Sequence, residues 1–294
     1  MSLRLSQKTC LKTPSKAKGR SLYRSIKGNI LDFEENTTNQ ENVSAIGSSK
    51  EQHNFNEQDQ HGLYKAIFNR RDVRGQFLPD AIPHKVLSRI LYAAHHAPSV
   101  GFMQPWDFIV IQSPEVKNKI HQDFSLAHQE AQAMFESNKQ ETYKNLKLEG
   151  IIESPINICI TCDRERTGKT VIGRTHMKEM DLYSSVCAVQ NFWLAARAEG
   201  IGVGWVSILH PDALRDTLSL PDNVVPIAYL CLGHVSHFKE KPELEAANWL
   251  PRRPIDELVS FDSWGQSASN SEEKSLITQL QLDEKFPQSF ADKK

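Results

Sequence analysis

Strands and helices alternate through the middle of this 294-residue chain, and this alternation is the feature that most constrains its fold. Met180 to Glu199 has apolar residues at helical spacing and ends before Gly200, where glycine commonly stops a helix. An apolar, β-rich run precedes it at Pro155 to Cys162, and two more follow at 201–209 and 224–235. Such elements pack as helical layers around a central sheet. The sequence therefore predicts a layered α/β or α+β domain.

Further elements fit this pattern. Helices are predicted at Pro83–His96, from Pro114 onward and at Pro211–Leu218, each with proline in its first turn, and a strand is predicted at Trp106–Gln112. The helix from Pro114 is too polar for the middle of a core. We expect it, with the stretch to Gly150, either to cover a cleft or to face solvent. In the helix from Met180 the expected buried face carries four apolar residues: Leu182, Val186, Val189 and Trp193.

The two ends of the chain differ from the middle in composition. Residues 1–31 are basic and contain no Asp or Glu, while residues 32–60 are rich in Asn, Gln, Glu and Ser. Neither stretch has enough apolar surface to offset the entropy lost on ordering. We expect residues 1–60 to be disordered, residues 61–265 to form the domain, and the polar residues 266–294 to form a disordered tail. A basic, acid-poor start is also typical of an organellar transit peptide, so both interpretations of the N-terminus stay open.

The overall composition excludes several classes of protein. The formal net charge is −1, which gives no electrostatic reason to expect a nucleic-acid or anionic-membrane partner. No apolar run approaches the roughly 20 residues that span a bilayer. The chain has 5 cysteines without a disulfide-framework spacing, which indicates a reducing compartment. We expect a cytoplasmic protein, or an organellar one if the N-terminus is a transit peptide.

Patterns for metal, redox or hydrolytic sites are weak. Cys159 and Cys162 have the spacing of a redox or zinc pair, but residues three apart in a strand point to opposite faces. Buried structural cysteines are the favoured interpretation. The histidines lack the His-Glu-x-x-His pattern, and no serine lies in a Gly-x-Ser-x-Gly turn. We expect no metal site and no hydrolase.

Arg70, Arg71 and Arg74 surround Asp72 in the sequence. Arginine suits a phosphate because its planar fork donates two parallel hydrogen bonds, so the cluster favours an anion site. A solvated helix end with one local salt bridge is the alternative. In either case the neighbouring cations are expected to depress the pKa of Asp72 and keep it ionised.

Gly202 and Gly204 open a strand instead of linking a strand to a helix, so the dinucleotide-binding interpretation fails. Glycine within a strand often marks the close approach of a flat ligand or of another backbone segment. Ser207 follows directly, where its hydroxyl could meet such a ligand. Tight internal packing is the alternative.

Three separated motifs resemble the flavin-binding elements of the nitroreductase family. They are Arg70–Arg74, Ala97–Trp106 and Gly202–Ser207, within a likeness that extends from about Tyr64 to Trp264. Nitroreductases usually have Ser where this chain has Asp72, and Asn where it has Phe102. Both departures resemble the BluB branch of the family, the aerobic 5,6-dimethylbenzimidazole synthases.

This resemblance implies an oxidoreductase that fragments reduced FMN with O2 into 5,6-dimethylbenzimidazole, the lower ligand of cobalamin, and erythrose 4-phosphate. It also implies an α+β fold with three layers, α/β/α, in an intertwined homodimer wrapped by the segment Trp249–Leu258. A separate NAD(P)H:flavin reductase would supply the reduced FMN. Two alternatives remain: a conventional FMN-dependent NAD(P)H nitro or quinone reductase, and a flavin-binding protein without turnover.

The resemblance also assigns roles to residues. Asp72 and Ser207 would be catalytic, Asp72 as proton acceptor beside the ribityl chain and Ser207 as hydrogen-bond donor near the reactive edge of the ring. The arginine cluster would hold the phosphate, and the helix from Pro114 would form a lid. His237 stands where this branch tends to carry an arginine. The full set implied to bind the flavin is Arg70, Arg71, Asp72, Val73, Arg74, His95, Ser99, Gln104, Gly204, Trp205, Ser207, Leu232 and His237.

Overall fold

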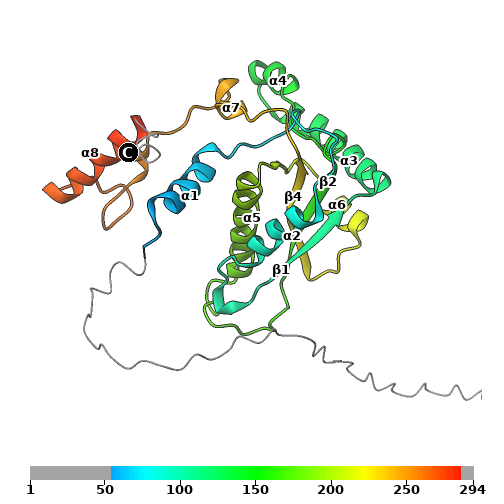
Figure 1. Ribbon diagram of the computed structural model, residues 1–294, viewed down its shortest axis with the longest axis horizontal. Coiled ribbons are helices and arrows are strands. Elements are labelled where there is room, and N and C mark those ends of the chain that lie inside the picture. The colour runs from blue at the N-terminus through cyan, green and yellow to red at the C-terminus, as the bar shows by residue number, and fades with distance from the viewer. Residues whose placement is uncertain (1–53, 286–294) are drawn as a thin grey trace, which may run out of the picture. The chain divides into compact units, whose positions relative to one another are not determined.

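A computed structural model describes residues 54–285, so the expectations for residues 1–53 and 286–294 lie outside the described part of the chain (Figure 1). Its centre is a four-stranded sheet in the order β1-β2-β4-β3, with every neighbouring pair antiparallel. The strands are β1 (Trp106–Ile111), β2 (Ile156–Asp163), β3 (Gly202–Val206) and β4 (Val224–Gly233). β2 and β4 occupy the middle, which explains the nearly continuous apolar sequence of β2: both of its faces are covered.

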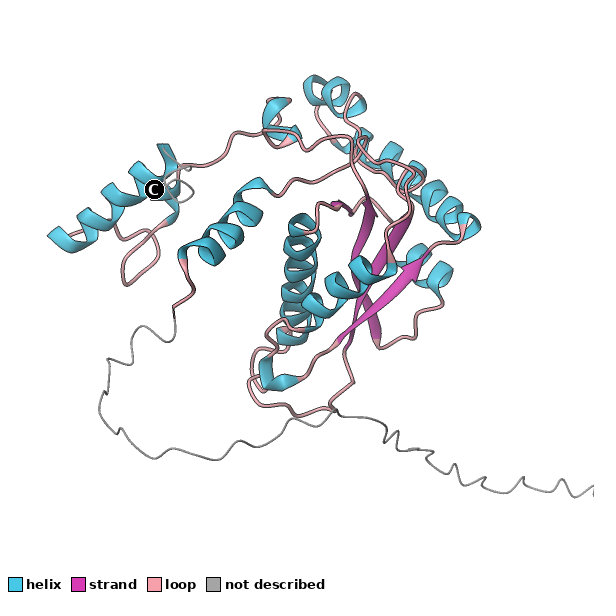
Figure 2. Cartoon of the chain, in the orientation of Figure 1, coloured by secondary structure: helices cyan, strands magenta, loops and turns pink. Residues whose placement is uncertain are grey.

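One face of the sheet is covered by α2 (His84–His95) and α5 (Met180–Ala198), and α1 (Glu57–Asn69) packs against α5 (Figures 1 and 2). The predicted buried face of α5 is wrong in part, because Val186 is 44% exposed and Leu182 only partly buried. The buried residues of α5 include Phe192 and four small residues, which let the helix lie close to the strands: Ser184, Ser185, Ala188 and Ala196.

The other face is covered by α3 (Pro114–Met134) and α6 (Pro211–Leu218), and α4 (Ser137–Lys144) packs against α3. Ser113 caps α3 by accepting a hydrogen bond from the Val116 N–H at 3.4 Å. α3 is polar overall, yet it buries Ile120 and Phe124 against the sheet. The predicted three-layer α+β fold is confirmed.

The C-terminal part contains α7 (Glu243–Ala246), a 3₁₀ turn η3 (Ile255–Leu258) and α8 (Ser271–Lys285). The predicted disorder of the tail from residue 266 is wrong over α8. Asn270 accepts hydrogen bonds from the Glu272 and Glu273 N–H groups, while the Glu273 carboxylate accepts from the Ser269 and Asn270 N–H groups. This reciprocal capping box offsets the low apolar content of the helix.

At the other end of the described chain, α1 begins at Glu57, before the expected domain boundary at His61. Asn56 caps it by accepting a hydrogen bond from the Asp59 N–H at 2.9 Å. No helix among residues 54–285 is long and apolar enough to cross a membrane.

Candidate functional site

The Arg70–Arg74 segment lies along the free edge of β3. The Val73 N–H donates to the Val203 carbonyl at 2.9 Å, and the Asp72 carboxylate accepts from the Trp205 N–H at 3.0 Å. A β-carbon built on Gly204 would lie 2.0 Å from the Val73 carbonyl oxygen. Gly204 is therefore required for the approach of another backbone segment, which is one of the alternatives that the sequence left open.

Asp72 is held at both carboxylate oxygens. Oδ1 accepts from Trp205, and Oδ2 lies 2.5 Å from Nη2 of Arg74. Burial nevertheless raises the pKa of Asp72 above its ordinary value, against the opposing effects of Arg74, the Trp205 N–H and Arg70. The predicted depression of this pKa is wrong, because the loss of hydration outweighs the neighbouring cations.

The three arginines make different contacts instead of converging on one group. Arg70 stacks its guanidinium 4.8 Å from the centre of the Trp193 ring. Arg71 donates to the carbonyls of Phe68, Arg70 and Glu240, and burial with the charge of Arg70 lowers its pKa. Arg74 bridges Asp72 and Glu243.

Two of these guanidiniums still have an unused donor. The Nε atoms of Arg71 and Arg74 are buried and have no hydrogen-bond partner among residues 54–285. A buried, unpaired N–H on a cation is a favourable position for an anion. The cluster therefore fits a phosphate group.

A cavity of about 210 Å³ lies beside this segment. Its wall includes Arg74, Trp205 and Ser207, the last of which is exposed just beyond the end of β3. Three aromatic rings, from α4, the α3–α4 connection and the C-terminal segment, line the rest together with four aliphatic side chains: Phe135, Tyr143, Trp249, Leu146, Leu148, Ile208 and Leu244. Of the stretch that we expected to cover a cleft, α4 and the segments on either side of it line this cavity, whereas α3 itself does not.

The aromatic rings of this cover contact one another. Phe135 lies 4.8 Å from Tyr143 and 5.1 Å from Trp249, measured between ring centres. The Tyr143 hydroxyl is buried without a hydrogen-bond partner among the described residues, and burial raises its pKa. Tyr143 and Glu243 were not predicted as site residues, because single residues in polar stretches carry no pattern.

Three other predicted site residues, His95, Ser99 and Gln104, lie near β1. Ser99 Oγ accepts from the Gln104 N–H at 3.1 Å, and Gln104 has a positive φ of 46°. His95 accepts from the Trp106 indole N–H at 3.1 Å. Since β1 and β3 are opposite edges of the sheet, one chain does not bring His95, Ser99 and Gln104 together with Asp72 and Ser207.

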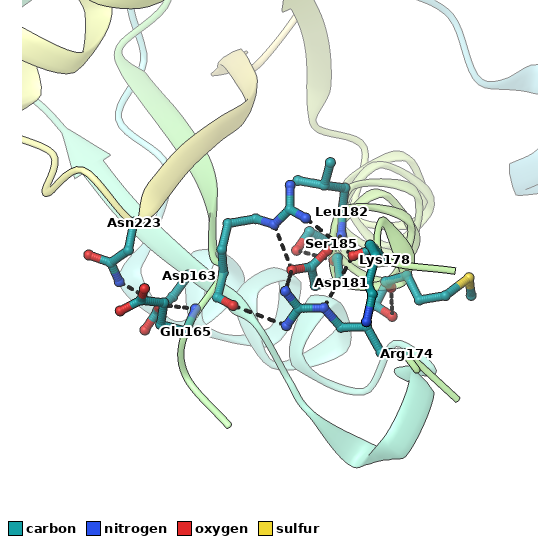
Figure 3. A network of polar contacts seen from close by, with 11 residues as sticks. Asp163, Glu165, Arg174, Lys178, Asp181, Leu182, Ser185 and Asn223 are labelled. Atoms are coloured by element: carbon teal, nitrogen blue, oxygen red, sulfur yellow. Dashed lines mark hydrogen bonds and ion pairs between the residues drawn. The ribbon is translucent and has the colours of Figure 1, made fainter. Parts of the chain in front are cut away.

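The Ser99–Gln104 segment rests on the loop of residues 164–178. Arg166 donates to the Gln104 carbonyl at 3.0 Å, and Val171 lies where a β-carbon on Gly101 would clash, at 2.6 Å. The loop is folded around the fully buried Asp181 (Figure 3). Its carboxylate accepts from Nε of Arg164 at 2.7 Å and lies 3.0 Å from Nη2 of Arg174.

Leu232 and His237 are two further predicted flavin contacts that do not line the cavity. Leu232 is fully buried in the core beside Val203, so its side chain packs within the domain. His237 is exposed, with Nδ1 3.1 Å from Ser236 Oγ.

The cysteine prediction is confirmed. Cys159 packs with Cys231 on the α3 side of the sheet, whereas Cys162 contacts Ser185 of α5 on the other side. Burial raises the pKa of Cys159 to about 12, which keeps it an unreactive thiol. No group of three or more potential metal ligands occurs among the residues that the structure describes.

Comparisons with known proteins agree with this architecture. The model of the nitroreductase family matches residues 67–234. A 5,6-dimethylbenzimidazole synthase from Rhodospirillum rubrum is 40% identical over 190 residues, which cover 64% of this chain and 90% of that protein.

Two solved structures share the fold. A BluB-like flavoprotein from Clostridium difficile 630 has a TM-score of 0.52 at 18% identity, covering 68% of this chain and 99% of that one. Oxidized iodotyrosine deiodinase bound to FMN and 3-iodo-L-tyrosine has a TM-score of 0.55 at 18% identity, covering 69% of this chain and 100% of that one.

Proposed function

This chain belongs to the nitroreductase family, and we propose that it is a 5,6-dimethylbenzimidazole synthase that fragments reduced FMN with O2. The products are 5,6-dimethylbenzimidazole, for the lower ligand of cobalamin, and erythrose 4-phosphate. The 5,6-dimethylbenzimidazole synthase that is 40% identical to this chain supports the assignment. Asp72 and Phe102, in place of the Ser and Asn usual in nitroreductases, support it as well.

The observation that carries the proposal is the position of Asp72. Its carboxylate is fixed by the Trp205 N–H and by Arg74. Trp205 and Arg74 both belong to the wall of the cavity that Ser207 also lines. A carboxylate whose pKa is raised by burial is a stronger base than one in water, which suits a proton acceptor. Asp72 would accept a proton as a ribityl carbon is oxidised.

The other residues would bind and orient the substrate. Arg70 and Arg71 would hold the phosphate, since Arg71 retains a buried unpaired donor. Ser207 would donate a hydrogen bond at the reactive edge of the ring. Bound reduced FMN would supply the electrons that O2 accepts. The cover of Phe135, Tyr143 and Trp249 would exclude water from the cavity.

A second copy of the chain would complete the site. Gln104 and Ser99 lie at the sheet edge opposite Asp72, so a homodimer is the simplest way to place both groups on one ligand. We propose this homodimer, with the segment Trp249–Leu258 contributing to its interface. A separate NAD(P)H:flavin reductase would supply the reduced FMN.

A conventional reductase would need an open face for NAD(P)H and then for a second substrate. In this chain the cavity beside Ser207 is lined by an aromatic cover, which suits a reaction whose second reactant is only O2. The residue at position 72 also separates the two functions, because Ser cannot act as a carboxylate base.

The test is a single-turnover experiment. The protein is loaded anaerobically with chemically reduced FMN, air is admitted, and the products are separated by chromatography. The wild type is expected to yield 5,6-dimethylbenzimidazole, and Asp72→Asn to lose about 10²–10⁴-fold in its rate of formation because a general base is missing.

Asp80→Asn makes the same chemical change at an exposed position and should leave the yield unchanged. Recovery of intact oxidised FMN from the wild type would contradict the proposal and favour the reductase. Equal product from wild type and Asp72→Asn would instead remove Asp72 from the mechanism.

A further inference from the structure

We infer that Glu243 is a positioning residue that controls the basicity of Asp72 by sharing the guanidinium of Arg74. The inference deepens the proposed function and rests on it only for the consequence in catalysis. Glu243 lies in α7, after the last strand, and none of the sequence motifs includes it.

The contacts form a continuous chain of alternating charge. Nη2 of Arg74 lies 2.5 Å from Asp72 Oδ2, and Nη1 of the same guanidinium lies 3.2 Å from Glu243 Oε2. Lys239 pairs with the other oxygen of Glu243. The side chains of Arg74, Glu243 and Asp72 are 11%, 16% and 30% exposed, so water screens the Arg74–Glu243 pair most weakly.

This geometry changes the role of Arg74. Both ends of its fork are occupied by carboxylates of the chain, which leaves Nε as its unpaired donor. An arginine between two carboxylates neutralises each of them less than an arginine paired with one. We therefore assign Arg74 mainly to Asp72, and the phosphate mainly to Arg70 and Arg71.

Four groups face Asp72 from the elements around it. Arg70 and Arg74 on its own segment and the Trp205 N–H on β3 favour the ionised carboxylate, whereas Glu243 on α7 opposes it. Lys239 acts on this balance through Glu243. If the charge of Glu243 is removed, Arg74 belongs to Asp72 alone, and the carboxylate becomes a weaker base.

Two substitutions should therefore move the titration of Asp72 in opposite directions. Glu243→Gln keeps an oxygen that can accept from Arg74 but removes the charge, so Asp72 should titrate at lower pH than in the wild type. Arg74→Met removes the shared cation, so Asp72 should titrate at higher pH.

The measurement is infrared difference spectroscopy of the full-length protein without FMN, following the protonated carboxyl band as pH is varied. The band of Asp72 is identified as the one that Asp72→Asn lacks. Glu115→Gln is the matched control, since it makes the same change of charge in the exposed ion pair with Lys119 on α3 and should not move the band. Lys239→Met, at an exposed partner of Glu243, should move it to higher pH.

The acid limb of the pH–rate profile for product formation should shift in the same direction as the band in each variant. An Asp72 band that titrates at the same pH in wild type, Glu243→Gln and Lys239→Met would overturn the inference. If the band shifts as expected but neither the wild type nor any variant forms 5,6-dimethylbenzimidazole at any pH, the inference holds and the proposed function fails.

Discussion

At the scale of single residues, Gly204 decides whether the candidate site can form. The backbone of residue 73 crosses β3 so closely that any side chain at position 204 would meet the Val73 carbonyl. The same crossing brings the Asp72 carboxylate to the Trp205 N–H. Packing and the catalytic group therefore depend on one glycine.

We predict that Gly204→Ala lowers the free energy of unfolding by about 1–3 kcal/mol, because the added methyl must push the two backbones apart. It should also reduce product formation, since Asp72 moves with residue 73. Urea denaturation and the single-turnover assay test both effects. Gly62→Ala in α1, where nothing lies within 4 Å of the new methyl, should instead stabilise by about 0.5–1 kcal/mol.

At the scale of elements, the loop of residues 164–178 has no helix or strand and is held by one buried carboxylate. Asp181, in the first turn of α5, binds Arg164 and Arg174, and Arg174 also donates to the Arg164 carbonyl at 3.0 Å (Figure 3). The same turn of the helix reaches the second motif, where Ser184 Oγ accepts from the Val100 N–H at 3.2 Å. The start of α5 thus orients both the loop and the Ser99–Gln104 segment.

We predict that Asp181→Asn destabilises the protein by about 3 kcal/mol, because two arginines would then share a neutral partner in a buried position. The change should be visible as a lower urea midpoint. Glu199→Gln breaks the ion pair with Arg89, which lies at the surface, and should have a much smaller effect. Equal effects of the two substitutions would contradict this view of the loop.

At the scale of the whole molecule, the two groups of site residues lie at opposite edges of one sheet. If each site combines Asp72 of one chain with Gln104 of another, two inactive variants should complement each other. We predict that a mixture of Asp72→Asn and Gln104→Ala, allowed to exchange subunits, recovers about a quarter of wild-type product formation. Random exchange makes about half of the dimers mixed, each with one intact site.

Single-turnover yield before and after subunit exchange provides the measurement, with each variant alone as its control. Sedimentation analysis should show that both variants remain dimers. A mixture no more active than its components would contradict a shared site.

The sequence by itself determined the strands of the sheet and the helices of the two layers that cover it, but not the C-terminal helices. Helical periodicity, proline at helix starts and the apolar run of β2 are local properties, and local chemistry decides them. The three motifs likewise identified Asp72, Ser207 and the arginine cluster as candidate residues. A capping box such as that of Asn270 and Glu273 is also a local signal, although the low apolar content of α8 concealed it.

Only the tertiary structure decided which charges meet and which groups are buried. Glu243 pairs with Arg74 across 169 positions of sequence, and no local pattern indicates such a contact. The pKa of Asp72 depends on hydration lost to surrounding elements, so the adjacent arginines predicted its direction wrongly. Close packing against the sheet determined which face of α5 is buried, so that Ser184 and Ala188 are buried and Val186 is exposed. Contacts between distant residues and the loss of hydration on burial both depend on the fold as a whole. They determine the chemistry of the site, so the site could not be read from local sequence.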